Sequence, residues 1–537
     1  MKTQKIALIS VYHKDGIIEF ASRLIALGFE ILASGGTAKH LISAGLPVTG
    51  VASLVGGKAI LGHRVVTLSR EIHAGLLARR IDADIQEMEE LGLPYIDLVC
   101  VDLYPLQEEI DKPDSTRESV IEQTDIGGPT MLRSAAKGRR IVIGDPDDRA
   151  NVAEWLDKGS PDKDNFLTVL AAKAEFIVAN YCLLSATYHG QGEYAGFLGK
   201  KAITCKYGEN GYQIPAYFYQ NANPEKDPLS LGKFQWVGGT TPSYNNLRDF
   251  QRLLQSMTHI AATFDLNYGD VPCIALGVKH GNSCGAAIAT DSAEAIKKMV
   301  AGDPQALFGG LVMVNFPVSE NIADLLLHHQ SENRRLWDGI IAPEFSGEAI
   351  KLLERKNGKC RLATNNFLYH LDRNSLDQSL IPVYARGGFQ LQPNYTFILN
   401  LQDVNIVKYG PPLTADSEKD LLLAKAICDT SNSNTITIVK NGQLIGNGVG
   451  QQSRVQGARL AVSIVDSIGH DIQGSVAASD SFFPFEDGPM FLKEAGVKVI
   501  FATSGSINDQ KVIDYCQNNE VTLYMLPDSQ ARGFYAH

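Results

Sequence analysis

The chain has 537 residues, more than the roughly 250–300 at which one hydrophobic core usually stops growing, so we expect two or three domains. Hydrophobic residues make up 44% and charged residues 20%, which excludes a disordered chain. The 49 Lys and Arg against 60 Asp and Glu give a net charge of -11, so no overall positive field attracts nucleic acid or anionic lipid.

The eight cysteines are scattered along the chain, and no two form a CxxC pair. This spacing indicates reduced thiols in the cytoplasm rather than a disulfide framework or a zinc knuckle. The N-terminal apolar run of about six residues is shorter than a signal-peptide core, and no stretch reaches the ~18 apolar residues of a membrane helix. We therefore expect a soluble cytoplasmic protein that does not span a membrane.

Residues 1–150 alternate between strand and helix patterns. An apolar run at 5–11 predicts a strand, the next residues recur at helical spacing up to Gly28, and a second strand at 29–34 runs into SGGT. Further elements continue this alternation: strands at 96–104 and 140–144 and a helix at about 165–187. The pattern is typical of an open α/β sheet.

The glycine-rich segment 190–201 has no apolar period and is the predicted domain boundary. A second α/β pattern begins at 271–287. Residues 435–449 predict a β-hairpin, because Asn441-Gly442 supplies the positive φ angles of a type I′ turn.

The sequence SGGT (34–37) lies where a strand ends and a helix begins. Glycines there let backbone N–H groups turn toward an anion at the positive end of the helix, and phosphate is the natural ligand. The alternative is an ordinary turn with Thr37 as the helix cap, and the motif alone leaves the two about equal. The sequence SGS (504–506), after another apolar strand, has the same two interpretations.

Lys279 and His280 are neighbours in the sequence VKHGNSCG. Neighbouring side chains on a regular strand point to opposite faces, so both enter one pocket only where the strand breaks, and GNSCG provides a break. A cation beside an imidazole favours its uncharged, basic form, and the ammonium stabilises developing negative charge. The pair suits formyl transfer to a weak amine nucleophile. A surface lysine beside a structural histidine is the more frequent meaning of such a pair.

Motifs from the whole chain occur in one order and at characteristic intervals, among them SGGTAKHL, DIGGPTMLRSAAK, KYGEN, SYNNLRD, VKHGNSCGAA, IIAPEFS, NGQLIGNGVGQQSR and SDSFFPF. In these motifs the chain resembles the bifunctional AICAR transformylase/IMP cyclohydrolase family of purine biosynthesis. The resemblance implies an α/β fold, with an N-terminal methylglyoxal-synthase-like three-layer domain over 1–195. Two cytidine-deaminase-like α/β subdomains would follow over 200–537 and divide near 375–415. It also implies a homodimer with shared active sites.

Two consecutive reactions follow from this resemblance. The family transfers a formyl group from 10-formyltetrahydrofolate to the 5-amino group of the ribonucleotide AICAR, and it then closes the product, FAICAR, to IMP with loss of water. The folate is a co-substrate. No metal is expected, because His280 and Cys284 lack further ligands at zinc spacing.

For formyl transfer, the resemblance makes His280 the base on the amine and Lys279 the group that stabilises the transition state. The other substrate positions are Lys206, Tyr207, Gly309, Asp338, Asn434 and Arg454, and the folate positions are Val455, Asp480, Ser504 and Gly505. For ring closure, it makes Lys137 the proton donor and acceptor, with Tyr104 and Asp125 beside it. The ribotide positions of this first domain are Lys14, Ser34, Gly35, Gly36, Thr37, Arg64, Thr67, Asp102 and Ile126.

The predicted ring-closure pocket departs from the family pattern. The departures include Tyr12, His13, Val66, Ser69, Arg70 and Asp102. Val66 replaces a lysine, and Asp102 adds negative charge where an anionic ribotide binds, while Arg70 and Arg139 are additional cations. Loss of one such contact commonly costs ~10²–10³ in rate, so formyl transfer is the more firmly predicted activity. In the second region Lys206 replaces an arginine and keeps the charge without its bidentate fork.

Two alternatives to this function stay open. One is a paralogue that formylates and closes a related aminocarboxamide nucleotide in specialised metabolism, since the substitutions cluster in pockets while the scaffold motifs persist. The other is a non-catalytic ribotide-binding protein that keeps the phosphate cradles without turnover.

Overall fold

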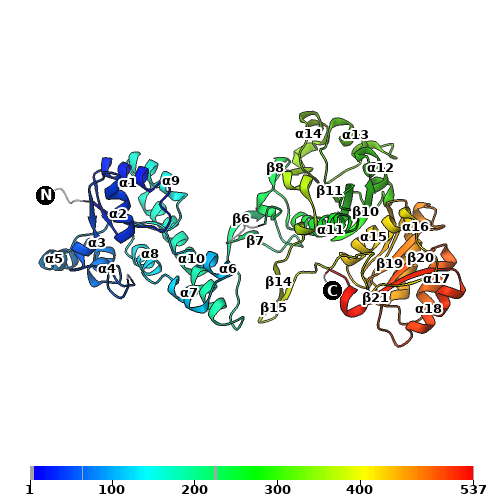
Figure 1. Cartoon of the computed structure of the whole chain (residues 1–537). Coiled ribbons are helices and arrows are strands. Elements are labelled where there is room, and N and C mark those ends of the chain that lie inside the picture. Colours follow the sequence, from blue (N-terminus) through cyan, green and yellow to red (C-terminus); the bar gives the residue numbers. More distant parts are fainter. Residues whose placement is uncertain (1–4, 63, 223–226, 536–537) are drawn as a thin grey trace. The chain divides into compact units, whose positions relative to one another are not determined.

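The computed structural model describes residues 5–62, 64–222 and 227–535. The chain divides into two compact units, Met1–Leu198 (unit 1) and Gly199–His537 (unit 2) (Figure 1). Both units are sheets covered by helices, which confirms the predicted α/β class.

Unit 1 contains a five-stranded parallel sheet in the order β3-β2-β1-β4-β5. Its strands are β1 (Lys5–Ser10), β2 (Phe29–Ala33), β3 (Val48–Gly50), β4 (Leu98–Val101) and β5 (Ile141–Ile143). Its helices are α1 (Ile17–Ala26), α2 (Gly35–Ser43), α3 (Val51–Leu54), α4 (Arg70–Leu77), α5 (Asp82–Glu90), α6 (Leu106–Asp111), α7 (Arg117–Glu122), α8 (Gly127–Lys137), α9 (Asp148–Asp157) and α10 (Lys163–His189). Because helices cover both faces, the central strands read as unbroken apolar runs.

The carboxyl ends of β2, β1 and β4 meet at one edge of this sheet, since the three strands are parallel neighbours. The segments that follow them are 34–37, 11–14 and 102–104. Parallel α/β sheets bind ligands at this edge, so the fold brings together three segments that are distant in sequence.

Helix α10 is long and apolar enough to cross a membrane by length and composition alone. The expectation that no segment is long and apolar enough to span a membrane is therefore wrong for α10. That expectation considered only uninterrupted runs of apolar residues. One such helix is weak evidence for a membrane span. Here Leu167, Leu170 and Val178 of α10 pack into the core of unit 1, and Lys173 pairs with Asp145 and Asp148.

Unit 2 is built on a twelve-stranded mixed sheet, in the order β16-β21-β20-β19-β17-β18-β10-β9-β11-β12-β13-β8. Its strands are β8 (Gln235–Gly238), β9 (Cys273–Lys279), β10 (Asn282–Ala289), β11 (Leu311–Val314), β12 (Gly339–Ala342), β13 (Arg361–Thr364), β16 (Val407–Tyr409), β17 (Ile436–Lys440), β18 (Gln443–Gly448), β19 (Val476–Ser479), β20 (Val499–Ser504) and β21 (Thr522–Pro527). Two small sheets pair β6 (Gly199–Cys205) with β7 (Ala216–Asn221) and β14 (Leu380–Ala385) with β15 (Gly388–Pro393).

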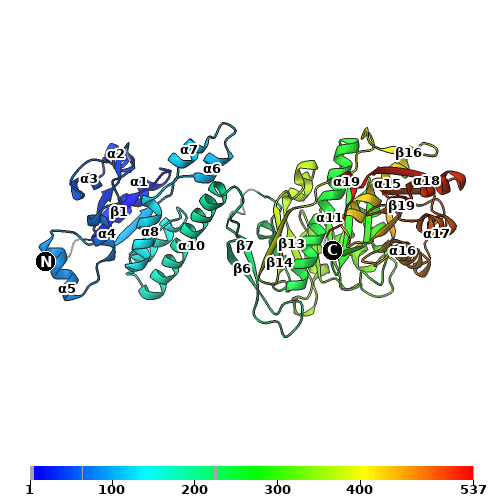
Figure 2. The ribbon, with the colours of Figure 1, turned by 90° about the horizontal axis from the view of Figure 1, so that it is seen from below.

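The two halves of the large sheet have the same arrangement of elements, counted from either edge of the sheet to its centre. Each half has an edge strand, a long helix, a hairpin and then helices that alternate with parallel strands, and the hairpins meet through β10 and β18. The long helices, α11 (Tyr244–Tyr268) and α15 (Ala415–Asp429), share one core on one face (Figures 1 and 2). The other face is covered by α12 (Ser292–Gly302), α13 (Glu320–His328), α14 (Gly347–Leu353), α16 (Arg454–Ile468), α17 (Asp487–Ala495) and α18 (Asp509–Asn518).

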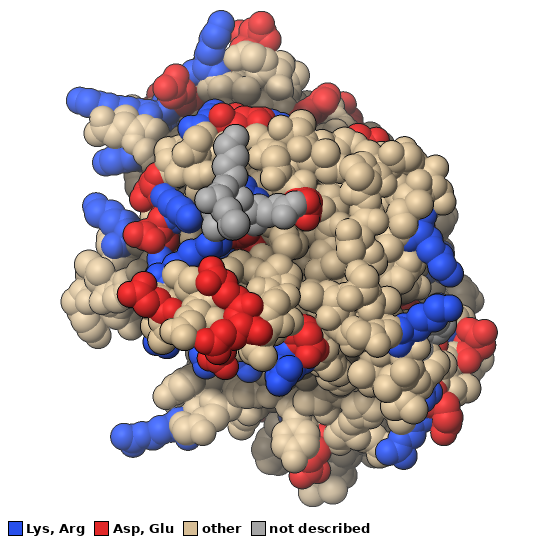
Figure 3. Space-filling view, turned by 90° about the vertical axis from the view of Figure 1, so that its left-hand side faces the viewer, with Lys and Arg blue, Asp and Glu red and all other residues tan. Residues whose placement is uncertain are grey.

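On the face that Figure 3 shows, Lys and Arg side chains are interspersed with Asp and Glu, and large areas carry no charge. This face has no continuous basic area outside the part that the grey atoms cover.

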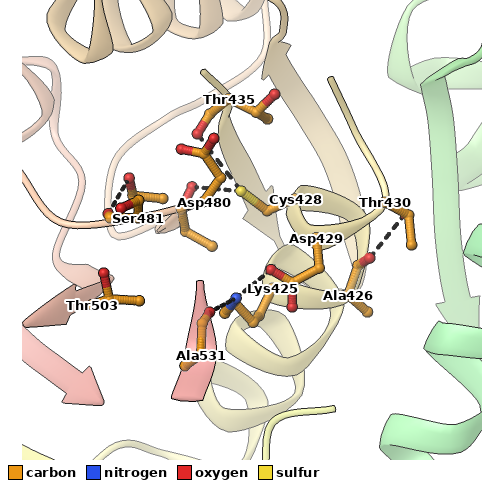
Figure 4. A network of polar contacts seen from close by, with 12 residues as sticks. Lys425, Ala426, Cys428, Asp429, Thr430, Thr435, Asp480, Ser481, Thr503 and Ala531 are labelled. Atoms are coloured by element: carbon orange, nitrogen blue, oxygen red, sulfur yellow. Dashed lines mark hydrogen bonds and ion pairs between the residues drawn. The ribbon is translucent and has the colours of Figure 1, made fainter. Parts of the chain in front are cut away.

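A buried ion pair lies between the shared core and the C-terminal segment (Figure 4). Lys425 of α15 bonds to Asp429 one turn later and donates to the carbonyl oxygen of Ala531 at 2.9 Å. The two side chains are only 1% and 2% exposed. Burial raises the pKa of Asp429 to about 6, although the Lys425 ammonium opposes that change.

We predict that Lys425→Met lowers the free energy of unfolding by about 3–5 kcal/mol, because it leaves a carboxylate buried without its cation. The double variant Lys425→Met/Asp429→Leu should recover most of this loss. Urea unfolding measures both. The control is the exposed pair of Lys158 and Glu154 at the C-terminal end of α9, with a 2.6 Å separation; Lys158→Met should change stability by under about 1 kcal/mol. Equal losses from Lys158→Met and Lys425→Met would contradict the prediction.

Candidate active sites

A two-residue turn, His280-Gly281, joins β9 to β10, with φ angles of 53° and 76°. Both angles are positive, as a type I′ turn requires. The predicted break of the strand after Lys279 is therefore present. Lys279 and His280 line one cavity of about 280 Å³, together with residues of β10, β18 and the segment after α12. This volume is near the lower limit of small-molecule pockets.

The loop beside this turn anchors Lys279. Its Nζ donates to the carbonyl oxygen of Phe308 at 2.8 Å. The next residue, Gly309, has a φ of 74° and donates its N–H to the Leu336 carbonyl. Asp338 pairs with Arg355 at 3.3 Å. The predicted substrate position Gly309 thus follows the residue that anchors Lys279, and the N–H of Asp338 donates to the Gly310 carbonyl in the same loop at 3.0 Å.

Hydrogen bonds tie the His280 turn to the loop that carries Asn434. The Asn282 side-chain oxygen accepts the N–H of Asn432 at 3.1 Å. The backbone and side-chain amides of Asn434 both donate to the carbonyl of Gln451, at 3.1 and 2.8 Å. Asn434 is therefore held in one orientation near the turn.

Arg454 and Asp480 form a second buried ion pair, at 2.9 Å. Arg454 begins α16, and Val455 follows it. Asp480 is fully buried and also accepts the Ser433 hydroxyl at 2.5 Å. This carboxylate therefore holds Arg454 and Ser433 in place.

The turn after β20 differs from an open anion cradle. The N–H groups of Gly505 and Ser506 donate to the carboxylate of Asp509, at 2.6 and 3.1 Å. Of the two interpretations of this SGS sequence, the structure therefore supports the ordinary turn. Lys206 and Tyr207 follow β6, and neither lines the cavity at Lys279.

In unit 1, SGGT begins α2 directly after β2, with Ser34 as the residue before the helix. The first N–H groups of a helix have no partner within it and favour an anion. Lys14 lies beside them, since its Nζ is 3.3 Å from the Thr37 hydroxyl and donates to the carbonyls of Val11 and Tyr12. Burial lowers the pKa of Lys14, and the nearby Asp102 opposes this effect.

Asp102 is bound to the segment that carries Lys14. Its carboxylate accepts the N–H of His13 at 2.8 Å. The negative charge introduced at this position is therefore partly satisfied by the chain itself.

Tyr104 and Asp125 lie together, as predicted for ring closure. Burial raises the pKa of Asp125, although the N–H groups of Gly128, Tyr104 and Gly127 oppose this shift. Burial, and then the Asp125 charge, raises the pKa of Tyr104. The N–H of Asp125 donates to the Tyr181 hydroxyl at 2.7 Å. Tyr181 comes from α10, and its role was not visible from the sequence because only packing brings α10 to this loop.

Lys137 is not beside Asp125 within one copy of the chain. Lys137 is the last residue of α8 and Asp125 lies two residues before its start, and a rise of ~1.5 Å per residue separates the ends of this helix by ~15 Å. Both line an open groove of about 720 Å³ between α8 and α10, and so does Ile126. Lys137 is exposed at the far end of this helix.

Further departures from the family pattern, and the predicted ribotide positions Arg64 and Thr67, have structural partners in unit 1. Val66 packs against the core, and Thr67 is buried with its hydroxyl next to Gly127. Ser69 caps α4 by accepting the N–H of Ile72. The three arginines each pair with a neighbouring carboxylate: Arg64 with Glu122, Arg70 with Glu71 and Arg139 with Asp164. A phosphate at Arg64 would therefore compete with Glu122.

Among the described residues, no group of three or more His, Cys, Asp or Glu is arranged to hold a metal. Burial raises the pKa of Cys284, the cysteine nearest the Lys279 cavity, to about 12. This thiol is therefore protonated at neutral pH and unsuited to nucleophilic attack.

Comparison with known proteins identifies two matching family models: an MGS-like domain over 16–130 and the AICARFT/IMPCHase bienzyme over 135–464. The bifunctional purine biosynthesis protein PurH of Neisseria gonorrhoeae is 34% identical over 97% of this chain and 98% of that protein. PurH of Pelodictyon phaeoclathratiforme is also 34% identical, over 97% of each chain. A solved structure described as "Crystal structure of ForH" is 35% identical and covers 36% of this chain and 100% of that chain, with a TM-score of 0.32.

The likeness to PurH therefore extends along both units, and the two family models meet between Thr130 and Ala135, inside α8. The chain belongs to the AICARFT/IMPCHase bienzyme family.

Proposed function

We propose that unit 2 transfers a formyl group from 10-formyltetrahydrofolate to the 5-amino group of AICAR, and that unit 1 closes the resulting FAICAR to IMP. The observation that carries the first step is the turn that brings Lys279 and His280 to one cavity. Family membership supports both steps. The protein would act in the cytoplasm, and its ligands would be a ribonucleotide and a folate.

The formyl transfer follows from the two side chains at the turn. As the amine nitrogen attacks the formyl carbon, the His280 imidazole accepts a proton from that nitrogen. The Lys279 ammonium stabilises the negative charge that develops on the formyl oxygen. The bond between the formyl carbon and N10 of the folate then breaks, and N10 takes up a proton. Asn434 and Arg454, both held by protein contacts, would orient the substrates.

Ring closure requires attack of the carboxamide nitrogen on the formyl carbon, followed by loss of water. Asp125 suits proton exchange in this step, because burial raises its pKa above that of a free carboxyl group. The α2 N-terminus and Lys14 would hold the ribotide phosphate. Tyr104, in the loop after β4, contacts the carboxylate of Asp125 through its backbone N–H.

We further propose a homodimer in which Lys137 of one copy completes the ring-closure site of the other. The ~15 Å length of α8 separates Lys137 from Asp125 in one copy. If a two-fold axis places two α8 helices antiparallel, the end of one helix lies beside the start of the other. The open groove along α8, which both residues line, supports this arrangement.

We predict that His280→Asn lowers kcat for formyl transfer by about 10²–10⁴, because it removes the base. Asparagine tolerates a positive φ, and Asn441 occupies the corresponding place in the β17-β18 turn with the same φ of 53°, so the backbone should be retained. Tetrahydrofolate release in the presence of AICAR measures the effect, while conversion of FAICAR to IMP should be unchanged. His328→Asn, on the exposed side of α13, is the control. Retained formyl transfer in His280→Asn would refute His280 as the base.

A second prediction concerns ring closure. Asp125→Asn and Lys137→Met should each reduce IMP formation from FAICAR by about 10²-fold or more and leave formyl transfer intact. Heterodimers of the two variants, isolated by two different affinity tags, should recover about half of the parental rate, because one of their two sites contains both native residues. Asp125→Asn homodimers isolated by the same two tags are the control. No recovery would show that the two residues do not act across copies.

A further inference from the structure

Unit 2 contains two hairpin turns with the same backbone and nearly the same sequence. Val278-Lys279-His280-Gly281 joins β9 to β10, and Val439-Lys440-Asn441-Gly442 joins β17 to β18. The φ angles at the two central positions are 53° and 76° in the first turn and 53° and 71° in the second. The two turns occupy equivalent places in the symmetric order of the sheet.

Each turn is held by an aspartate at the same place on a long helix. Asp249 is the sixth residue of α11, and Asp420 is the sixth residue of α15. Asp420 accepts the N–H groups of Asn441 and Gly442, at 2.8 and 2.6 Å. Asp249 accepts the N–H of Gly281 at 2.8 Å, and the N–H of His280 also faces it. The carboxylate is therefore part of the fold of both halves.

The two turns differ in their side chains and in the partners of those side chains. In the second half, Lys440 is bound by the carboxylate of Asp471 at 2.6 Å, and asparagine stands where the first half has its imidazole. In the first half, Lys279 donates to a backbone carbonyl and His280 lines the cavity. The same support thus holds a chemically reactive turn in one half and a structural turn in the other.

Helix α11 holds the surroundings of the first turn as well. Arg252, one turn after Asp249, donates to the carbonyls of Thr430 and Tyr535, both at 2.8 Å. Its guanidinium stacks over the Tyr535 ring at 4.5 Å. The turn, the loop before Asn434 and the C-terminal segment are therefore all fixed to one rigid helix.

We propose that Asp249 is a positioning residue for formyl transfer: by accepting the N–H groups of the turn, its carboxylate holds His280 in the left-handed conformation that directs the imidazole toward the substrate amine beside Lys279. The side chain itself touches neither substrate. This inference rests on the proposed role of His280. It goes beyond that role in assigning the geometry of the base to a residue on α11.

The experiment compares Asp249→Ala with its structural counterpart, Asp420→Ala, in the full-length protein. Asp249→Ala should lower kcat for formyl transfer by about 10–100-fold and leave KM for AICAR and for the folate within about twofold, because misplacement of a base affects the reacting geometry. Asp420→Ala removes the equivalent bonds and should lower Tm by a few degrees without changing kcat. Equal effects of the two variants on kcat would overturn the proposal.

Asp249→Asn supplies the second arm of the test. Its side-chain oxygen can still accept the turn N–H groups, so kcat should return to within a few-fold of the parent. An Asp249→Asn protein as slow as Asp249→Ala would show that the charge matters and not the turn geometry, which would also overturn the proposal. Asp249→Asn remains informative if Asp249→Ala does not fold.

A readout independent of turnover separates this inference from the proposed function. In protein labelled with ¹⁵N-histidine, the imidazole signals assigned through His280→Asn should shift or broaden in Asp249→Ala and stay unchanged in Asp420→Ala. If the parent releases no tetrahydrofolate with AICAR but these shifts occur, the proposed substrate fails while the positioning role holds. Unchanged His280 signals in Asp249→Ala would refute the positioning role directly.

Discussion

A carboxylate on the second turn of a long buried helix accepts the backbone N–H groups of a tight hairpin turn, and unit 2 uses this contact twice. The contact matters because His280 has a φ of 53°, a conformation that a residue with a Cβ rarely adopts without support. A regular strand would send Lys279 and His280 to opposite faces. The turn removes that restriction, and both side chains reach one cavity.

The support of this turn depends in turn on how α11 and α15 are packed. Both helices lie on one face of the twelve-stranded sheet and contribute to a single core. Buried charge within that core is paired, as with Lys425 and Asp429, or hydrogen-bonded, as with Arg252. A buried polar group without a partner is costly, so each such pair strongly disfavours alternative packings of the helices. The result is a rigid frame for the turn and for Arg454.

The candidate site of unit 1 is formed in a different way. Its parallel strands end at a common edge, and the segments after β1, β2 and β4 bring Lys14, residues 34–37 and Asp102 together there. The substitutions in this pocket are integrated into the structure, since Asp102 binds the backbone of His13 and Ser69 caps α4. The length of α8 keeps Lys137 away from Asp125 in one copy, and for this reason the proposed ring-closure site requires a second copy.

The alternation of strands and helices, the hairpin at Asn441-Gly442 and the strand break after Lys279 could all be derived from the sequence, because each depends on local apolar period or on glycine at a turn. The placement of Lys279 and His280 at one cavity was also expected there, and the structure has both side chains lining it. Other features needed the tertiary structure: the hydrogen bonds from the turn after Ser504 to Asp509, the contact of Tyr181 with Asp125, and the contact of Asp249 with the His280-Gly281 turn. These depend on segments that are brought together only by packing, and a side chain's partner across a sheet or helix leaves no periodic signal in the chain. The distance from Asp125 to Lys137 is the clearest case. The two residues belong to one motif in the sequence, but in the structure they lie at opposite ends of a rigid helix.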